Sequence, residues 1–298
     1  MLGWRLIGSA VLIPLLGFIF YLDQQQGPNA PILLAVVVLM AIRGCWELTT
    51  MLKTRSFQPS FLATSVCSCL ILLAAWGTHW QTAGGAALNF SQLGLPMLVF
   101  SVSILALFLK GALKYREPGT SMETLGAELL TVSYIGVLLT LTAQLRWTAG
   151  GSAGYLALGS VIIAAKSGDI GAYTLGRLFG KKKMIPRLSP GKTWMGAWGA
   201  VLGSGLGSIL WFQLATPMFN ENWMPCEWYW AVLFGVIIGI VGLVGDLCES
   251  LIKRDLGQKD SAVLLPGFGG LLDLLDSVLY AGPVAYLLWS VLPLLPSV

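Results

Sequence analysis

The chain has 298 residues, of which 56% are hydrophobic and 11% are charged. Soluble domains carry about 25% charged residues, so this composition excludes an ordinary soluble protein and indicates a polytopic membrane protein. The net charge of +4 at pH 7 does not indicate a nucleic-acid partner, because the basic residues fall in loops between apolar segments.

Nine apolar segments are close to the length of about 20 residues that a helix needs to cross a bilayer. They cover residues 5–21, 31–51, 60–79, 93–113, 125–143, 153–172, 195–215, 229–250 and 271–294. Arg5 precedes the first, as in a signal peptide, but no clear small-x-small cleavage site follows, so we expect a retained helix. The predicted fold is an all-α polytopic membrane helix bundle of about nine transmembrane helices, with an N-terminal region at 1–120 that continues into a catalytic region at 121–298.

The basic residues are concentrated on one side of this predicted bundle. Starting from the N-terminus, alternate loops hold 16 of the 18 Lys and Arg residues. Cytoplasmic loops are rich in Lys and Arg, so this pattern predicts a cytoplasmic N-terminus and an external C-terminus. It also predicts that the two polar stretches described below face the cytoplasm, where nucleotides are found.

The cysteines and the single histidine do not indicate a zinc or disulfide site. Four of the five cysteines lie inside or at the ends of apolar segments and no CxxC pair exists, so we interpret them as small buried hydrophobic residues. His79 ends an apolar segment and is interpreted as an interface residue. Arg43 and Glu47 are one helical turn apart in the second segment, which favours an ion pair over a contact with a lipid phosphate.

The first polar stretch runs from Lys166 to Gly196 and reads KSGDIGAYTLGRLFGKKKMIPRLSPGKTWMG. Its last part offers five cations, together with the hydroxyl groups of Ser189 and Thr193. A triphosphate needs charge neutralisation and directed donors, so Ser189, Lys192 and Thr193 are predicted to bind nucleotide phosphates. The run of three consecutive lysines has a second interpretation, because any cytoplasmic loop is enriched in lysine.

The second polar stretch runs from Gly245 to Ser277 and reads GDLCESLIKRDLGQKDSAVLLPGFGGLLDLLDS. Charged groups inside a membrane cost roughly 2.5–3.5 kcal/mol each and mark functional sites. In helical flanks, one face would hold Asp246, Glu249, Ser250 and Lys253, and another would hold Asp273 and Asp276. The glycine turn that ends at Gly270 would present backbone N–H groups, which favour anions, before a helix. These features predict a metal–phosphate site rather than a solvated loop.

Both stretches resemble the integral-membrane phosphatidate cytidylyltransferases, also called CDP-diacylglycerol synthases. The first matches the D-x-G-A-Y, G-R, F-G-K and S-P-x-K-T-W-x-G series of that family, from Asp169 to Gly196. The second matches the pattern S-x-x-K-R-x4-K-D, then P-x-H-G-G-x-x-D-R-x-D, at Ser250, Lys253, Arg254, Lys259, Asp260, Pro266, Gly269, Gly270, Asp273 and Asp276. Phe268 stands where the family has His, and Leu274 stands where it has Arg.

The resemblance implies that CTP and phosphatidic acid react to give CDP-diacylglycerol and pyrophosphate, with Mg²⁺ and with a second metal ion as a weaker expectation. The expected metal ligands are Asp246, Asp273 and Asp276. The expected catalytic residues are Asp246, Asp273, Lys253, Arg254, Lys259 and Asp260. The expected substrate contacts are Asp169, Tyr173, Ser189, Lys192, Thr193, Gly269 and Gly270. A homodimer is expected from the resemblance, and the compact chain suggests a bacterial cell membrane, with the active site facing the cytoplasm.

Three alternatives stay open at this point. Another CTP-dependent lipid enzyme, such as a polyprenol kinase or a CDP-archaeol synthase, would use the same chemical groups. A membrane transporter could use the acids as an ion path, although the charges cluster on one membrane face and no inverted repeat is visible. An inactive scaffold is motivated by Phe268 and Leu274.

Overall fold

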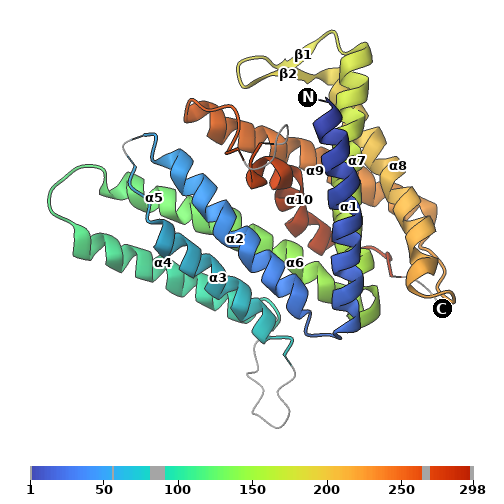
Figure 1. The fold of residues 1–298 in the computed structure, drawn as a ribbon, viewed down its shortest axis with the longest axis horizontal. Helices are drawn as coiled ribbons and strands as arrows, with labels where there is room; N and C mark the ends of the chain where they lie inside the picture. The colour runs from blue at the N-terminus through green and yellow to red at the C-terminus, as the bar shows by residue number, and fades with distance from the viewer. Residues whose placement is uncertain (1, 56, 81–90, 264–268, 296–298) are drawn as a thin grey trace. The chain divides into compact units, whose positions relative to one another are not determined.

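The computed structural model describes residues 2–55, 57–80, 91–263 and 269–295, and Phe268, the first departure from the family pattern, lies outside this set. The described residues are mostly helical (Figure 1). In chain order the helices are α1 (Leu2–Gln25), α2 (Pro31–Leu52), α3 (Phe61–Gly77), α4 (Gly94–Lys114), α5 (Ser121–Thr131), the π-helical η1 (Val132–Val137), α6 (Leu138–Thr148), α7 (Gly150–Phe179), α8 (Trp194–Phe219), α9 (Trp228–Asp255) and α10 (Leu271–Val291).

Each predicted apolar segment coincides with a helix, since α5, η1 and α6 follow one another without a break. Within the described residues, six helices are long and apolar enough to cross a membrane: α2, α4, the α5–η1–α6 helix, α8, α9 and α10. Helices suit this environment because lipid offers no hydrogen bonds, so backbone groups must bond to one another within the segment. The chain is a multi-pass membrane protein.

The chain divides into two compact units. Unit 1 comprises residues 1–140 and 260–274, and unit 2 comprises residues 141–259 and 275–298. The divisions fall inside the α5–η1–α6 helix and inside α10. In unit 1, α3 packs against α2, α4 and η1, around a core that includes Ile71, Leu107 and Val132.

In unit 2, α8 packs along both α7 and α9. The α7–α8 contact is close because glycines face each other across it. A Cβ atom added at Gly171 would lie 2.1 Å from the carbonyl oxygen of Gly199, and one added at Gly199 would lie 2.3 Å from that of Gly171. Small residues allow helix backbones to approach in this way, and the contact holds α7 beside α8.

A β-hairpin joins α7 to α8, and the predicted all-α fold did not include it. Strand β1 (Lys183–Ile185) pairs antiparallel with β2 (Ser189–Thr193), with Lys183 opposite Thr193 and Ile185 opposite Ser189. Both strands are edges, so Pro190 is tolerated within β2. The hairpin ends where Thr193 caps α8, because its Oγ1 accepts a hydrogen bond from the backbone N–H of Gly196 at 3.1 Å.

Candidate functional site

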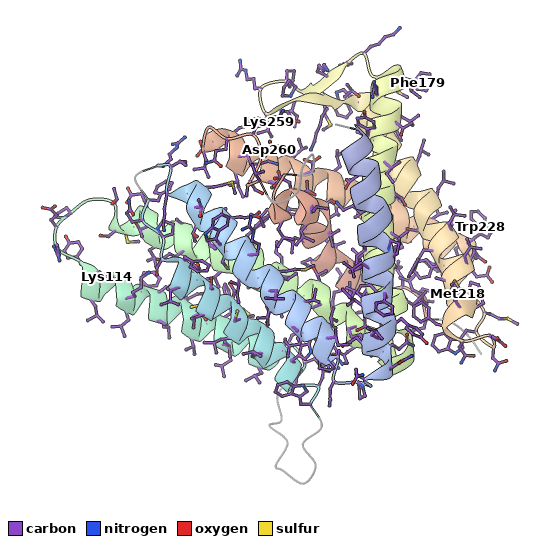
Figure 2. The ribbon with its side chains drawn as sticks, in the orientation of Figure 1. Lys114, Phe179, Met218, Trp228, Lys259 and Asp260 are labelled. Atoms are coloured by element: carbon purple, nitrogen blue, oxygen red, sulfur yellow. The ribbon has the colours of Figure 1, made fainter. Side chains whose placement is uncertain are left out.

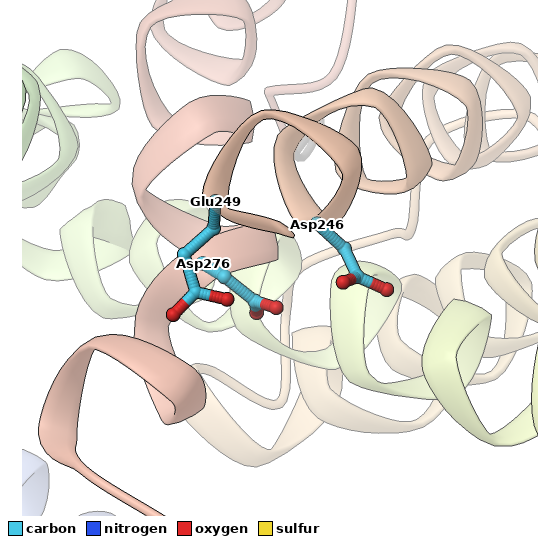
Figure 3. Close-up of side chains that lie close together, drawn as sticks. All are labelled: Asp246, Glu249 and Asp276. Atoms are coloured by element: carbon cyan, nitrogen blue, oxygen red, sulfur yellow. The ribbon is translucent and has the colours of Figure 1, made fainter. Parts of the chain in front are cut away.

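Three carboxylates of unit 2 come together, and we call them the carboxylate trio: Asp246, Glu249 and Asp276. One oxygen from each lies within 4.8 Å of the others. Asp246 and Glu249 are three residues apart on α9, so they share one side of that helix, while Asp276 comes from α10 (Figure 3). Glu249 and Asp276 are buried, whereas Asp246 is partly exposed. The trio therefore has one open side.

Two members of the trio form short ion pairs with lysines. Lys192, on the hairpin, places its Nζ 2.8 Å from Asp246 Oδ2. Lys253, one turn further along α9, donates from its Nζ to Glu249 Oε2 at 2.6 Å. Lys192 and Asp246 are more than fifty residues apart along the chain, so the first pair joins the two polar stretches predicted from the sequence into one site.

The third member, Asp276, belongs to a network that reaches α7. Lys166 Nζ donates to Asp169 Oδ2 at 2.8 Å and to Ser277 Oγ at 3.0 Å, and it lies 3.8 Å from Asp276 Oδ1. The Ser277 hydroxyl in turn donates to Asp169 Oδ2 at 3.1 Å. The backbone N–H of Ser277 donates to Asp276 Oδ1 at 2.5 Å. Asp169, a predicted nucleotide contact, is thus connected to the trio.

Two other predicted residues of unit 2, Tyr173 and Arg254, have contacts of their own outside the trio. Tyr173 is exposed near the end of α7, and its hydroxyl accepts a hydrogen bond from Arg177 at 2.6 Å. Arg254 bonds to the carbonyl oxygens of Leu188 and Gln258, at 3.4 and 3.0 Å. These contacts connect the end of α9 to the hairpin turn.

The connection between α9 and α10 carries two more of the predicted catalytic residues. Lys259 and Asp260 are both exposed on this connection (Figure 2). Lys259 belongs to unit 2 and Asp260 to unit 1. Both side chains are therefore open to solvent.

In unit 1, Asp273 organises the end of the glycine turn. Its Oδ2 accepts hydrogen bonds from the backbone N–H of Ser261 at 2.8 Å, from the Ser261 hydroxyl at 2.9 Å and from the N–H of Gly270 at 2.8 Å. Gly269 has a φ of +88°, which favours glycine. Asp273 therefore ties Ser261, the residue after Asp260, to Gly270 at the start of α10.

Glu47, from α2, also binds the start of α10. It is fully buried and accepts hydrogen bonds from the backbone N–H groups of Leu271 and Leu272 at 2.9 and 3.0 Å. It also accepts the Ser261 hydroxyl at 2.9 Å. The predicted ion pair with Arg43 is confirmed at 2.9 Å. The backbone N–H groups that we expected to favour an anion thus face the protein's own carboxylates.

The family model described as "Cytidylyltransferase family" matches residues 4–292 of this chain. The chain belongs to the cytidylyltransferase family. A Pseudomonas aeruginosa protein named phosphatidate cytidylyltransferase is 32% identical over 295 residues, which cover 97% of this chain and 98% of that protein.

Shorter matches connect this cytidylyltransferase family member to other curated proteins. A Mycobacterium leprae protein named phosphatidate cytidylyltransferase is 43% identical over 136 residues, or 46% of this chain. The Escherichia coli uncharacterized protein YnbB is 40% identical over 126 residues, or 42% of this chain. In both cases the matched region spans 40% of the relative's length.

In this cytidylyltransferase family member, the trio offers a donor set that suits a hard divalent cation. All three ligands are carboxylate oxygens, which Mg²⁺ prefers to nitrogen or sulfur. Oxygens on opposite sides of Mg²⁺ lie about 4.2 Å apart, twice a bond of about 2.1 Å. The 4.8 Å limit on the trio is close to this value, so the residues fit a divalent ion after a small side-chain adjustment.

Three residues of this site, Glu249, Lys166 and Ser277, are not among those predicted from the sequence. Glu249 was placed on the same helical face as Asp246 but was not predicted as a ligand, although its i+3 spacing was a sufficient signal. Lys166 precedes Asp169 by the same spacing and was not assigned. Ser277 carried no signal in the sequence, because its contacts with α7 arise only from packing.

Proposed function

We propose that this protein transfers CMP from CTP to phosphatidic acid, giving CDP-diacylglycerol and pyrophosphate. The observation that carries the proposal is the carboxylate trio with its lysines, assembled from both polar stretches of a cytidylyltransferase family member. A phosphate oxygen of the lipid attacks the α-phosphorus of CTP, and pyrophosphate leaves. In-line transfer of this kind depends on positioning and charge stabilisation.

The proposed nucleophile needs no strong general base. The second pKa of a phosphate monoester is about 6, so the lipid phosphate is mostly ionised at neutral pH. Phe268 in place of the family's His is therefore compatible with the reaction. Leu274 removes one arginine, and in the proposal Lys253 or Arg254 takes over its role.

The proposed metal is Mg²⁺, with a second ion as an extension of the proposal. Asp246 and Asp276 would hold it together with Glu249, and Asp273 is retained as a further proposed ligand. Held by these residues, Mg²⁺ would supply positive charge against the negative charge that develops on the phosphates. The remaining work falls to side chains that bind and orient the two substrates.

In the proposal, different side chains bind the lipid phosphate, the pyrophosphate and the nucleotide. Lys253, Arg254 and Lys259 would neutralise the pyrophosphate or hold the lipid phosphate, with Asp260 beside them. The nucleotide would be held by Asp169, Tyr173, Ser189, Lys192 and Thr193, with Gly269 and Gly270 at the second polar stretch. Residues 121–298 form the proposed catalytic region, within one bundle continuous with residues 1–120.

A single assay tests the proposed reaction. The purified protein is incubated with labelled CTP, phosphatidic acid and Mg²⁺, and we expect label from the cytidine in the lipid fraction. A phosphorylated prenol formed from added polyprenol would instead indicate a kinase, and no consumption of CTP would indicate a transporter or scaffold. Asp246→Asn and Asp273→Asn should each abolish labelling, and full activity of either variant would remove that residue from the proposed ligands.

We also propose nine spans, a cytoplasmic N-terminus and a site that faces the cytoplasm from the inner membrane. The charge asymmetry of the loops supports this topology. A cysteine introduced at Lys182, on the exposed hairpin, should react with a membrane-impermeant maleimide only after the membrane is opened. One introduced at Glu221, in the exposed α8–α9 loop, should react in intact cells.

Background from the native thiol nearest to Glu221 should be low. Burial raises the pKa of the Cys226 thiol to about 11, so it is protonated and unreactive at neutral pH. The opposite labelling pattern would invert the proposed topology.

The homodimer expected from the resemblance is tested separately, by the mass of the detergent-solubilised protein in light scattering.

A further inference from the structure

The carboxylates of the trio are each accompanied by a lysine from a different position in unit 2. Lys192 lies on the hairpin and Lys253 on α9, and both form ion pairs of less than 3 Å with their partners. Lys166 lies on α7, 3.8 Å from Asp276, and is held there by Asp169 and Ser277. Each carboxylate of the trio thus has an ammonium group within 4 Å, and Lys166 is shared between Asp276 and Asp169.

A divalent cation at the trio would compete with these ammonium groups. It would need the same carboxylate oxygens as ligands. Two cations separated by about 4 Å repel each other strongly where water is scarce, and Glu249 and Lys253 are both buried. The lysines therefore oppose the binding of a metal that arrives alone.

Nucleotide phosphates change this balance because they are acceptors for the same ammonium groups. We infer that Lys166, Lys192 and Lys253 are exchangeable partners, which neutralise the carboxylates first and transfer to phosphate oxygens when a metal and a nucleotide bind together. The inference rests on the proposed function, and it assigns to Lys166 a part in substrate binding. No bond is made or broken in this exchange, and each lysine keeps its proton.

The exchange makes metal and nucleotide binding mutually dependent. Each ligand raises the affinity for the other by the same factor, since coupling between two sites is reciprocal. Removing a lysine should therefore have effects of opposite sign on the two ligands. The metal alone should bind more tightly, and the nucleotide should bind more weakly. A variant that merely damaged the site would weaken both.

The test uses the full-length protein in detergent and the variants Lys166→Met and Lys192→Met. Mn²⁺ is titrated without nucleotide, and the free ion is measured by electron paramagnetic resonance. The retention of labelled CTP is then measured at saturating Mn²⁺ without phosphatidic acid, so that no turnover occurs. The matched control is Lys114→Met, because Lys114 is an exposed lysine at the end of α4 in unit 1 (Figure 2).

We expect each variant to bind Mn²⁺ about tenfold more tightly than the unchanged protein, the scale of one lost charge interaction of about 1.4 kcal/mol. CTP retention should fall by at least a similar factor, and the control should change neither quantity. Should Lys166→Met not fold, Lys192→Met decides the question alone, because it alters the hairpin rather than a helix.

An unchanged or weaker Mn²⁺ affinity in a folded variant would overturn the inference. That result would leave the proposed function intact if the unchanged protein still transfers CMP to lipid. Conversely, failure of the unchanged protein to consume CTP would remove the proposed function and the inference together. The two failures are therefore distinguishable in the same set of preparations.

Discussion

Replacing Glu47 by Gln tests how unit 1 holds the second polar stretch. Glu47 accepts four hydrogen bonds, from the backbone N–H groups of Leu271 and Leu272, from the Ser261 hydroxyl and from Arg43. Gln has nearly the same shape but carries no charge, and one of its two terminal atoms is a donor. We expect the variant to loosen the start of α10 from α2.

The magnitude follows from these contacts. Whichever way the amide is placed, its NH₂ group faces at least one backbone N–H, which leaves a buried donor unsatisfied at a cost of about 1–3 kcal/mol. The remaining bonds change from charged to neutral, and each loses about 1 kcal/mol. Together with the Arg43 charge left without its carboxylate, the loss should reach about 3–5 kcal/mol, as for other broken buried pairs.

Glu128 provides a matched control in the same unit. It is also buried, pairs with Lys110, and accepts the backbone N–H of Ser60 at 2.7 Å. Glu47→Gln should lower the thermal midpoint in detergent by about 6 °C or more for a unit of this size. Glu128→Gln should lower it by less, because Ser60 and Lys110 both bond to Oε1 of Glu128 and a Gln carbonyl oxygen can take that position. The two variants should differ in the segment from Ser261 to Leu272, which Glu128 does not contact within the hydrogen bonds described here.

Two measurements separate the variants. Hydrogen exchange of the peptide that covers Leu271 and Leu272 should accelerate in Glu47→Gln and not in Glu128→Gln. CMP transfer at a temperature where both remain folded should fall only in Glu47→Gln. Equal exchange and equal activity in the two variants would refute the reasoning, because Glu47 would then act only as one more buried charge.

Three further changes probe the site and its support. Asp276→Asn should reduce the rate of CMP transfer more than about 100-fold, which is the upper range for groups that only orient a metal ligand. The control is Glu227→Gln, at the other end of α9, which should keep its rate. Comparable rates in the two variants would contradict the proposed site. Gly199→Ala places a methyl group 2.3 Å from a carbonyl oxygen of α7, while Gly205→Ala on the same helix meets nothing within 4 Å. The first should unfold at a clearly lower temperature, and the second should be neutral or stabilising by up to about 1 kcal/mol. Thr193→Ala should lower the free energy of unfolding by about 1 kcal/mol, because it removes the cap of α8, whereas Thr193→Ser should keep the cap. Thermal unfolding measures the difference, and equal midpoints for the two variants would exclude a role for the cap.

The helices were predictable because the signal for them is local. An apolar run of about 20 residues can satisfy its backbone in lipid only as a helix, so composition alone located every helix of the described chain. The hairpin was not predictable in the same way. It is short and polar, and it depends on the pairing of Lys183 with Thr193 rather than on any periodic pattern.

The spacing of acids along α9 and α10 predicts a metal–phosphate site, and the structure brings Asp246 and Asp276 of that prediction together. The pairing of Lys192 with Asp246, which joins the two polar stretches, had no signal in the sequence. The contacts of Glu47 with Ser261 and with the start of α10 had no signal, since more than 200 residues separate them along the chain.

The amino-acid sequence by itself determined the class of this protein, the position of its helices and the two stretches that carry its polar groups. These properties depend on residues that are neighbours along the chain, so composition and spacing are enough to reveal them. Only the tertiary structure decided which acid meets which lysine, and that a glutamate of α2 binds the start of α10. These contacts depend on helix packing, because the distance between two helices and the rotation of each helix about its axis determine which side chains meet.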